Sequence, residues 1–367
     1  MRILLVVGVD PWTRSVSTVH KYAAAAKAQG HEIVVFGPAH WELPTLNFTT
    51  DLSDIDLALF VVQVPSDFPD MPYLATLLDG LPRERRMLVD MWGRFNDTIR
   101  LEHDFNHLEK MDGHQGWEWE DAMQAASDVI LQPTLSPLRP QVGSFLFHGF
   151  DPGSVLRAHT TAKKAAAAWT DREFGALYVG SNWQRWEQVH RFFEGYRTIR
   201  DRAGKACLVG WDWDERPQWA EKLGIKGVDT DKAFLANVGV ETRSGVHFNE
   251  VVELLGKARF APVIHRPLFR HLGLVTNRTF ETFYADAIPV LMLPRDFVAS
   301  IYGEAGLALV PGPDLAAHLD DALTRAEFYW DAVLQVRGHL GRHHSYAQRL
   351  GELASLPTTA PRLGAAA

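Results

Sequence analysis

Residues 277–289 read NRTFETFYADAIP, and this stretch says most about the fold and the function. Helical spacing of its apolar residues is followed by a run at residues 288–293 that is typical of a buried strand. Arg278 and Glu281 stand at the predicted helix start, where Thr279 can act as the cap. A helix start can hold a phosphate, an arginine adds donors, and a carboxylate can accept hydrogen bonds from ribose hydroxyls. The stretch predicts a nucleoside diphosphate site, and a capped helix with a local Arg–Glu pair is the alternative.

Apolar runs alternate with amphipathic stretches on both sides of this segment. In the first part of the chain, strands are predicted at residues 3–7, 31–36, 57–62, 87–89, 129–131 and 145–147, and a helix at residues 13–29. In the second part, strands are predicted at residues 175–179, 206–209, 260–264, 288–293 and 307–310, and helices at residues 185–202, 250–257, 279–287, 314–325 and 329–353. This alternation is typical of βαβ units and parallel sheets. The sequence therefore predicts an α/β protein with two Rossmann-like domains.

The composition changes mark four parts of the chain. We predict an N-terminal domain at residues 1–150, a polar, alanine-rich linker at residues 151–172 and a C-terminal domain at residues 173–340. A C-terminal helix and a disordered tail are expected within residues 341–367. Ligands of open α/β sheets bind at the carboxyl ends of the strands, so the two domains are expected to face a cleft that holds the ligands.

The overall composition excludes several classes of protein. The 367 residues carry a net charge of −8, which argues against a protein built to grip nucleic-acid phosphates. The single cysteine, Cys207, excludes a disulfide framework and a cysteine metal cluster. No apolar run approaches the roughly 20 residues that cross a bilayer. The run at residues 3–9 is too short for a signal peptide and is broken by Asp10, so we expect a cytoplasmic protein with no transmembrane segment.

Arg278-Thr279-Phe280-Glu281, followed by YADAIPV at residues 284–290, resembles the R-x-F-E-x-x-A-x-G-x-P signature of group 1 glycosyltransferases. These enzymes have the GT-B fold, and the branch most similar to this chain is that of the spore-maturation CgeB-like proteins. The resemblance implies that the glutamate binds the ribose of a nucleotide-sugar donor and that the three residues before it lie at the donor site. Asp286 stands where the family usually has glycine, and Gly273 where many retaining relatives have their first glutamate.

Four other stretches are similar to segments of GT-B enzymes and occur in the same order. They are residues 28–34 at the end of the first helix, residues 148–152 at the close of the N-terminal domain, residues 249–254 before the donor site, and residues 344–349 in the C-terminal helix of the CgeB-like branch. Together the matches span nearly the whole chain. The resemblance implies that the C-terminal helices cross back to the N-terminal domain.

Two loops of the C-terminal domain hold candidate donor-binding residues. Gly180, Asn182 and Arg185 lie where a predicted strand turns into a helix: the glycine allows a tight turn, the asparagine can cap the helix, and the arginine can reach an anion. The resemblance implies that this loop contacts the donor diphosphate, and an ordinary βα turn is the alternative. His265 and Arg266 precede the donor helix and can bring positive charge to the diphosphate; a solvated turn is the alternative.

Candidate catalytic and acceptor-binding residues lie in the N-terminal domain. Asp10 and Asp90 each follow a predicted strand, and His148 lies at the domain junction, so each is a candidate base for an inverting reaction. Each can instead be a cap or a satisfied polar group, and a retaining enzyme would need no such base. Trp12 and Trp92 are candidate acceptor platforms because flat aromatic faces stack on sugars.

A histidine-rich stretch at residues 100–114 contains His103, His107 and His114. The first two are four residues apart and would share a helix face, as metal ligands can. No strict ligand motif is present, and a mobile loop on the acceptor side is the alternative. We therefore predict no metal site and no cofactor beyond the nucleotide-sugar co-substrate.

The sequence thus predicts a metal-independent glycosyltransferase of the hexosyltransferase type. It would move a sugar from a nucleotide-diphosphate sugar, such as a UDP-sugar, to an acceptor that is a saccharide, a protein or a small molecule, and no nucleic-acid partner is expected. A nucleotide-sugar 2-epimerase would use the same donor groups without an acceptor. A non-catalytic nucleotide- or sugar-binding protein is the other alternative, which Gly273 keeps open.

Overall fold

The structure is a computed structural model that describes residues 1–9, 15–62, 73–96, 117–222 and 227–356. The chain forms two compact units. The first unit consists of Met1–Gly149, His271–Thr276 and Ser345–Ala367, and the second of Phe150–Arg270 and Asn277–His344. Residues 151–172, which we expected to form a linker, lie in the second unit.

A seven-stranded parallel sheet forms the centre of the first unit, with the strand order β3-β2-β1-β4-β5-β6-β7. The strands are β1 (Arg2–Val6), β2 (Glu32–Phe36), β3 (Phe48–Thr49), β4 (Leu57–Val62), β5 (Arg86–Asp90), β6 (Val129–Gln132) and β7 (Val142–Ser144). Every residue of β4 and β5 is buried, as expected for a parallel sheet that helices cover on both faces.

The helices of the first unit include one from the end of the described chain. They are α1 (Ser15–Ala28), α2 (Leu74–Gly80), the 3₁₀ turn η2 (Arg83–Arg85), α3 (Trp117–Ala126) and α15 (Tyr346–Ser355). Helix α15 packs against α1, where the Tyr346 ring meets the Tyr22 ring edge-on at 5.2 Å between centroids. This contact confirms the prediction that the chain returns to the N-terminal domain at its end.

The second unit contains a five-stranded parallel sheet with the order β10-β9-β8-β11-β12. Its strands are β8 (Phe174–Val179), β9 (Ala206–Val209), β10 (Val240–Arg243), β11 (Ala258–Val263) and β12 (Ile288–Leu291). Its longer helices are α4 (Ala162–Trp169), α5 (Trp186–Arg197), α8 (Lys232–Val238), α11 (Asn277–Tyr284), α12 (Arg295–Tyr302), α13 (Leu315–Thr324) and α14 (Ala326–His343). Its shorter helical segments are η5 (Pro152–Ser154), α6 (Arg200–Ala203), α7 (Gln218–Lys222), η6 (Phe248–Glu250), α9 (Val251–Leu255), α10 (Pro267–His271) and η7 (Glu304–Leu309).

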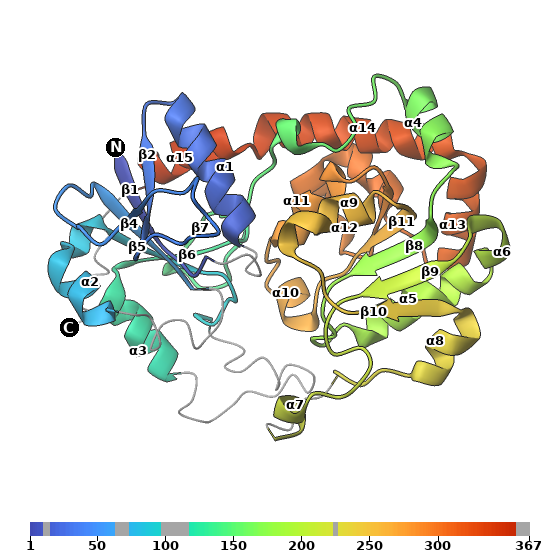
Figure 1. The fold of residues 1–367 in the computed structure, drawn as a ribbon, viewed down its shortest axis with the longest axis horizontal. Helices are drawn as coiled ribbons and strands as arrows, with labels where there is room; N and C mark the ends of the chain where they lie inside the picture. Colours follow the sequence, from blue (N-terminus) through green and yellow to red (C-terminus); the bar gives the residue numbers. More distant parts are fainter. Residues whose placement is uncertain (10–14, 63–72, 97–116, 223–226, 357–367) are drawn as a thin grey trace. The chain divides into compact units, whose positions relative to one another are not determined.

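Helices lie on both sides of this second sheet, and α14 runs along one side of the sheet (Figure 1). The two sheets and their helices confirm the predicted α/β class with two Rossmann-like domains. Within the described residues, no helix combines the length and the apolar character needed to cross a membrane.

The structure corrects four predicted elements. The strand predicted at residues 145–147 is wrong, because β7 occupies Val142–Ser144 and the following buried run is not paired as a strand. The strand predicted at residues 307–310 is wrong, because most of it lies in the 3₁₀ helix η7. The helix predicted at residues 185–202 is two helices, α5 and α6, and the helix predicted at residues 329–353 is also two, α14 and α15. The two wrong strand predictions concern apolar runs that resemble strands in the sequence because they are at least partly buried.

Candidate functional site

The strand order of the second sheet reverses between β8 and β11. In open α/β sheets, ligands bind at such a switch point, in the crevice outside the carboxyl ends of the strands. Residues 180–185 follow β8, and residues 264–266 follow β11. The two candidate donor loops therefore flank the switch point of this sheet, although residues 186–263 separate them in the sequence.

Gly180 is fixed in place by the strand next to β8. Its N–H group donates to the Val209 carbonyl at 2.8 Å, and its own carbonyl accepts from the Trp213 indole Nε1 at 2.7 Å. Trp213 is buried and packs edge-on against Tyr178 with 6.0 Å between the centroids. A buried tryptophan thus sets the course of the backbone as it leaves β8.

Asn182 does not cap helix α5, so that prediction is wrong. Arg185 occupies the position before the helix, and no side chain there accepts a capping hydrogen bond. The Asn182 amide instead donates to the Val228 carbonyl at 2.9 Å and to the Thr230 hydroxyl at 2.8 Å. The residue fastens the loop after β8 to a distant segment of the chain.

His265 lies in a cluster of positive charge at the switch point. Its side chain is buried, and its Nε2 atom has no hydrogen-bond partner among the described residues. Burial is the main cause that lowers the pKa of the imidazole from 6.5 to about 3, and the nearby charges of Arg185, Arg266 and Arg270 contribute to the same shift. The imidazole is therefore neutral at physiological pH, and the three guanidinium groups concentrate positive charge around it.

Arg266 brings the two loops together. Its guanidinium lies 3.8 Å from the centre of the Phe269 ring and 6.0 Å from the centre of the Trp183 ring. Trp183 belongs to the loop after β8, whereas Arg266 follows β11. Contact with aromatic faces fixes the position of a guanidinium, so this geometry suits a phosphate-binding arginine.

The burial of His265 makes a testable prediction about stability. Below pH 6.5 the unfolded chain protonates this imidazole, whereas the folded chain does so only near pH 3. The neutral imidazole therefore makes its full contribution to the free energy of unfolding above pH 6.5. As the pH falls below 6.5, this contribution decreases by about 1.4 kcal/mol per pH unit. Urea denaturation at pH 7 and pH 5 should show that the wild type loses roughly 2 kcal/mol more than His265→Asn. The same loss in both proteins would contradict the assignment.

Glu281 is almost completely buried on α11. Its Oε2 atom lies 2.8 Å from Nη1 of Arg278, and its Oε1 atom accepts from the Asn277 amide at 3.2 Å. The ion pair does not meet hydrogen-bond geometry, because both Arg278 Nη1 and Glu281 Oε2 remain without a hydrogen bond among the described residues. The carboxylate is thus held in place, while its Oε2 atom can still accept a hydrogen bond from a hydroxyl group.

The neighbours of Glu281 have structural roles. Helix α11 begins at Asn277, so Thr279 lies inside its first turn and the prediction of a cap there is wrong. Thr279 is fully buried, and its carbonyl accepts from the Tyr302 hydroxyl at 2.9 Å. The buried Phe280 ring lies 6.0 Å from the His344 ring. These two residues hold the helix, and Arg278 and Glu281 are its charged groups.

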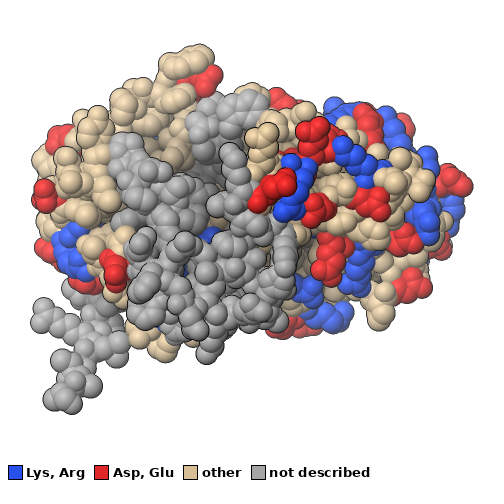
Figure 2. Space-filling view, turned by 90° about the horizontal axis from the view of Figure 1, so that it is seen from below, with Lys and Arg blue, Asp and Glu red and all other residues tan. Residues whose placement is uncertain are grey.

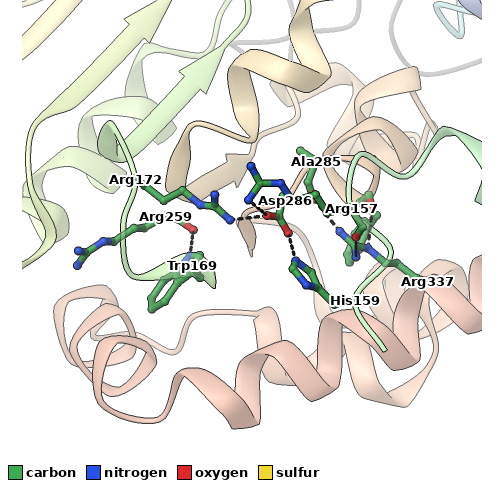
Figure 3. Close-up of polar contacts among 9 residues, drawn as sticks. Arg157, His159, Trp169, Arg172, Arg259, Ala285, Asp286 and Arg337 are labelled. Carbon is green, nitrogen blue, oxygen red and sulfur yellow. Dashed lines mark hydrogen bonds and ion pairs between the residues drawn. The ribbon is translucent and has the colours of Figure 1, made fainter. Parts of the chain in front are cut away.

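A buried ionic cluster surrounds Asp286 directly after α11 (Figure 3). Its carboxylate pairs with Arg172, lies 2.7 Å from Nε2 of His159 and 3.5 Å from a guanidinium nitrogen of Arg157. Side chains from residues 157–172 therefore meet at the Asp286 carboxylate. The local sequence around Asp286 does not indicate these partners, because they lie more than 100 residues away.

Arg337 of α14 completes the fastening of α11. Its Nε and Nη2 atoms donate to the carbonyls of Phe283 and Ala285 at 2.9 Å and 2.8 Å (Figure 3). These carbonyls are the ones that the end of a helix leaves without intrahelical partners. Burial lowers the pKa of Arg337 to about 10, so it remains charged at physiological pH. The helix that carries Glu281 is thus fixed at its C-terminal end by charged groups.

Gly273 has a conformational reason to be glycine. Its φ angle is +61°, in the left-handed region, and an added Cβ atom would lie 3.3 Å from the Thr134 hydroxyl. A glutamate at this position would be strained. The backbone conformation at this position therefore favours glycine.

Asp90 organises a turn at the end of β5. Its buried carboxylate accepts from the backbone N–H groups of Phe95 and Trp92 at 2.8 Å and 3.3 Å and from the Gln132 amide at 2.9 Å. These donors occupy the carboxylate, which fits a structural role. Trp92, half-buried in the same turn, lies with its ring 5.6 Å from the Arg94 guanidinium.

The other candidates of the first unit are placed differently. His148 is buried, with its Nδ1 atom 2.9 Å from the Thr18 hydroxyl, which also accepts from Tyr346 at 3.4 Å. Asp10, Trp12 and the histidines of residues 100–114 lie outside the described residues. Among the residues that are described, no three His, Cys, Asp or Glu side chains are grouped so that they could hold a metal ion.

Several solved glycosyltransferase structures match both units. An alpha-glucosyltransferase in complex with UDP-glucose and abasic-site DNA matches with a TM-score of 0.55 at 10% identity, covering 98% of this chain and 99% of that one. The beta-glucosyltransferase of phage T4 matches with a TM-score of 0.54 at 11% identity, covering 97% and 100%. WaaG, a glycosyltransferase of lipopolysaccharide biosynthesis, matches with a TM-score of 0.52 at 12% identity, covering 97% and 100%. The chain has the GT-B glycosyltransferase fold.

No family model matches the chain, and no curated protein matches its sequence. At 10% to 12% identity the structural matches concern the fold. The roles of individual residues must therefore be argued from the geometry of this GT-B protein.

Proposed function

We propose that this GT-B protein is a glycosyltransferase whose second unit binds a nucleotide-sugar donor. One observation supports this most strongly: three arginines surround a neutral, buried His265 at the switch point of the second sheet. Such a concentration of positive charge suits a diphosphate. Helix α11 packs against β11, so the strand that leads to His265 also contacts the helix that carries Glu281.

Each group has a part in this proposal. Arg185, Arg266 and Arg270 bind the diphosphate and stabilise the negative charge that develops on the leaving group, without a metal ion. Glu281 accepts hydrogen bonds from the ribose, and its ion pair with Arg278 keeps it oriented. Arg278, first expected at the diphosphate, acts through this carboxylate.

The finer assignments rest on the sequence. Residues 277–289 and 344–349 support membership of the CgeB-like branch, and we propose a hexose as the transferred sugar. The first unit would bind the acceptor. Asp10 is proposed as the catalytic base because it follows the first predicted strand in the sequence, and ligands of open α/β sheets bind at the carboxyl ends of the strands.

Turnover of donors tests the proposal. We expect the protein to release nucleoside diphosphate from at least one UDP-, GDP-, ADP- or dTDP-sugar, measured by chromatography. Arg266→Ala should lower kcat/KM for that donor by about 10²- to 10³-fold, as removal of a charge-stabilising donor does. Arg325→Ala is the matched control, because that arginine is exposed and precedes α14.

The outcomes separate the proposed function from its alternatives. Donor that is epimerised in the absence of any acceptor would indicate a 2-epimerase. Tight binding without consumption of any donor would indicate a non-catalytic binding protein. Equal activity of Arg266→Ala and the wild type would contradict the proposed diphosphate site.

We also propose that the acceptor is not a nucleic acid, although two of the similar structures are glucosyltransferases and one of them is bound to DNA. Residues 1–149 contain 20 Asp and Glu against 11 Lys and Arg, a net charge of −9. Acidic and basic side chains are interspersed over the second unit on the face shown in Figure 2. A protein that grips a phosphate backbone needs a surplus of cations on the surface that meets it.

DNA binding can be measured directly. Fluorescence anisotropy with a labelled duplex should show no binding at micromolar protein, even at low salt, where phosphate contacts are strongest. Binding that weakens steeply as salt is added would contradict the proposal, because such a slope counts the phosphates that are neutralised.

A further inference from the structure

Trp211 is an exposed indole at the carboxyl edge of the second sheet. It follows β9, the strand next to β8, and 54% of its surface is exposed. The ring lies against Gly245 in the loop after β10: a Cβ atom added to that glycine would lie 2.4 Å from Cε2 of the indole. Because only a glycine leaves room for this contact, one part of the ring packs against the backbone at Gly245. More than half of the surface of Trp211 is exposed.

The loop that carries Trp211 is held by its neighbours. The Trp211 carbonyl accepts from the N–H group of Asn182 at 2.9 Å, which ties the loop to the one after β8. The Thr242 hydroxyl on β10 donates to the Asp214 carboxylate at 3.0 Å. These two hydrogen bonds therefore hold the loop that carries Trp211 in place.

The phosphate-binding cluster begins a short distance away. Three residue steps lead from Asn182, which is bonded to Trp211, to Arg185, so at most about 11 Å of extended backbone separates them. A nucleoside diphosphate can bridge such a span, with its base at one end and its phosphates at the other. An aromatic platform at this distance from Arg185, one of the three arginines near His265, therefore suits a nucleotide.

We propose that Trp211 is the stacking platform for the nucleobase of the donor. This inference rests on the proposed function and deepens it, because it assigns a residue to the base. Every base has a π-face, so stacking adds affinity without choosing between bases. Trp211 accordingly contributes to the affinity for the nucleotide, whereas other groups of the protein determine which base is preferred.

Binding measurements on three variants test the assignment. We expect Trp211→Ala to weaken the binding of the preferred nucleoside diphosphate, chosen from UDP, GDP and ADP, by about 5- to 150-fold. Trp211→Phe, which keeps a flat aromatic face, should recover most of the affinity. The affinity for inorganic pyrophosphate should change less than about twofold, because the arginines remain. Trp41→Ala is the matched control, since that tryptophan is 83% exposed in the first unit.

Two results would overturn the assignment. Unchanged nucleotide affinity in Trp211→Ala would show that the base does not stack there, and an equal loss of pyrophosphate binding would show a general disturbance of the loop. Failure of the wild type to bind any of the three nucleotides would instead contradict the proposed function.

Discussion

Replacing Glu281 with alanine is expected to weaken nucleoside diphosphate binding by about 100-fold, or roughly 3 kcal/mol. The substitution removes the buried carboxylate, so the ribose hydroxyls lose the hydrogen bonds that they donate to it. Each hydrogen bond to a charged group contributes about 1.5–3 kcal/mol. Arg278 also loses the partner that lies 2.8 Å away. Isothermal titration calorimetry with the preferred nucleoside diphosphate measures the effect.

The ligand itself provides the control for this prediction. The 2′-deoxy form of the same nucleotide lacks one of the hydroxyl groups that the carboxylate is proposed to hold. Its affinity should be lower than that of the ribonucleotide in the wild type, and the two should be nearly equal in Glu281→Ala. Glu281→Gln keeps one acceptor oxygen and should lie between them. If the wild type and Glu281→Ala discriminate equally between the two ligands, Glu281 does not bind the ribose.

Replacing Asp286 with alanine is expected to lower the free energy of unfolding by about 3–5 kcal/mol, as removal of one partner of a buried ion pair does. The Asp286 side chain is 1% exposed, and that of Arg172 is 6% exposed. The substitution leaves the arginine buried without its carboxylate and releases His159 as well. Urea denaturation at neutral pH measures the loss.

An exposed ion pair of the same chemical type provides the control. Asp320 pairs with Arg202, and both side chains are at least half exposed. Asp320→Ala should cost less than about 1 kcal/mol, because water already solvates both groups. Losses of similar size in the two variants would contradict a structural role for the cluster around Asp286.

The sequence predicted the central strands well for a physical reason. Strands such as β4 and β8 are buried on both faces, so they appear as continuous apolar runs. The short edge strands β3 and β10 were not predicted, because they are only partly buried and their apolar content is low. The run at residues 145–147 is buried without being a strand, which misled the prediction.

The position of the candidate site followed from chain order, whereas the individual contacts did not. Residues after β8 and β11 must meet at the switch point of a parallel sheet, so Gly180 and His265 could be predicted as neighbours of a ligand. The amide of Asn182 bonds to residues 228 and 230, and local sequence contains no signal for such a pairing. The partners of Asp286 lie more than 100 residues away for the same reason.

The most direct test of the account is calorimetric titration of the wild type with UDP, GDP, ADP, CDP and dTDP and with the matching monophosphates. If the arginines around His265 form a diphosphate site, at least one nucleoside diphosphate binds with a Kd in the micromolar range, and its monophosphate binds at least about tenfold more weakly. A protein that binds none of the five nucleoside diphosphates at millimolar concentration, or that binds mono- and diphosphates equally, would contradict it.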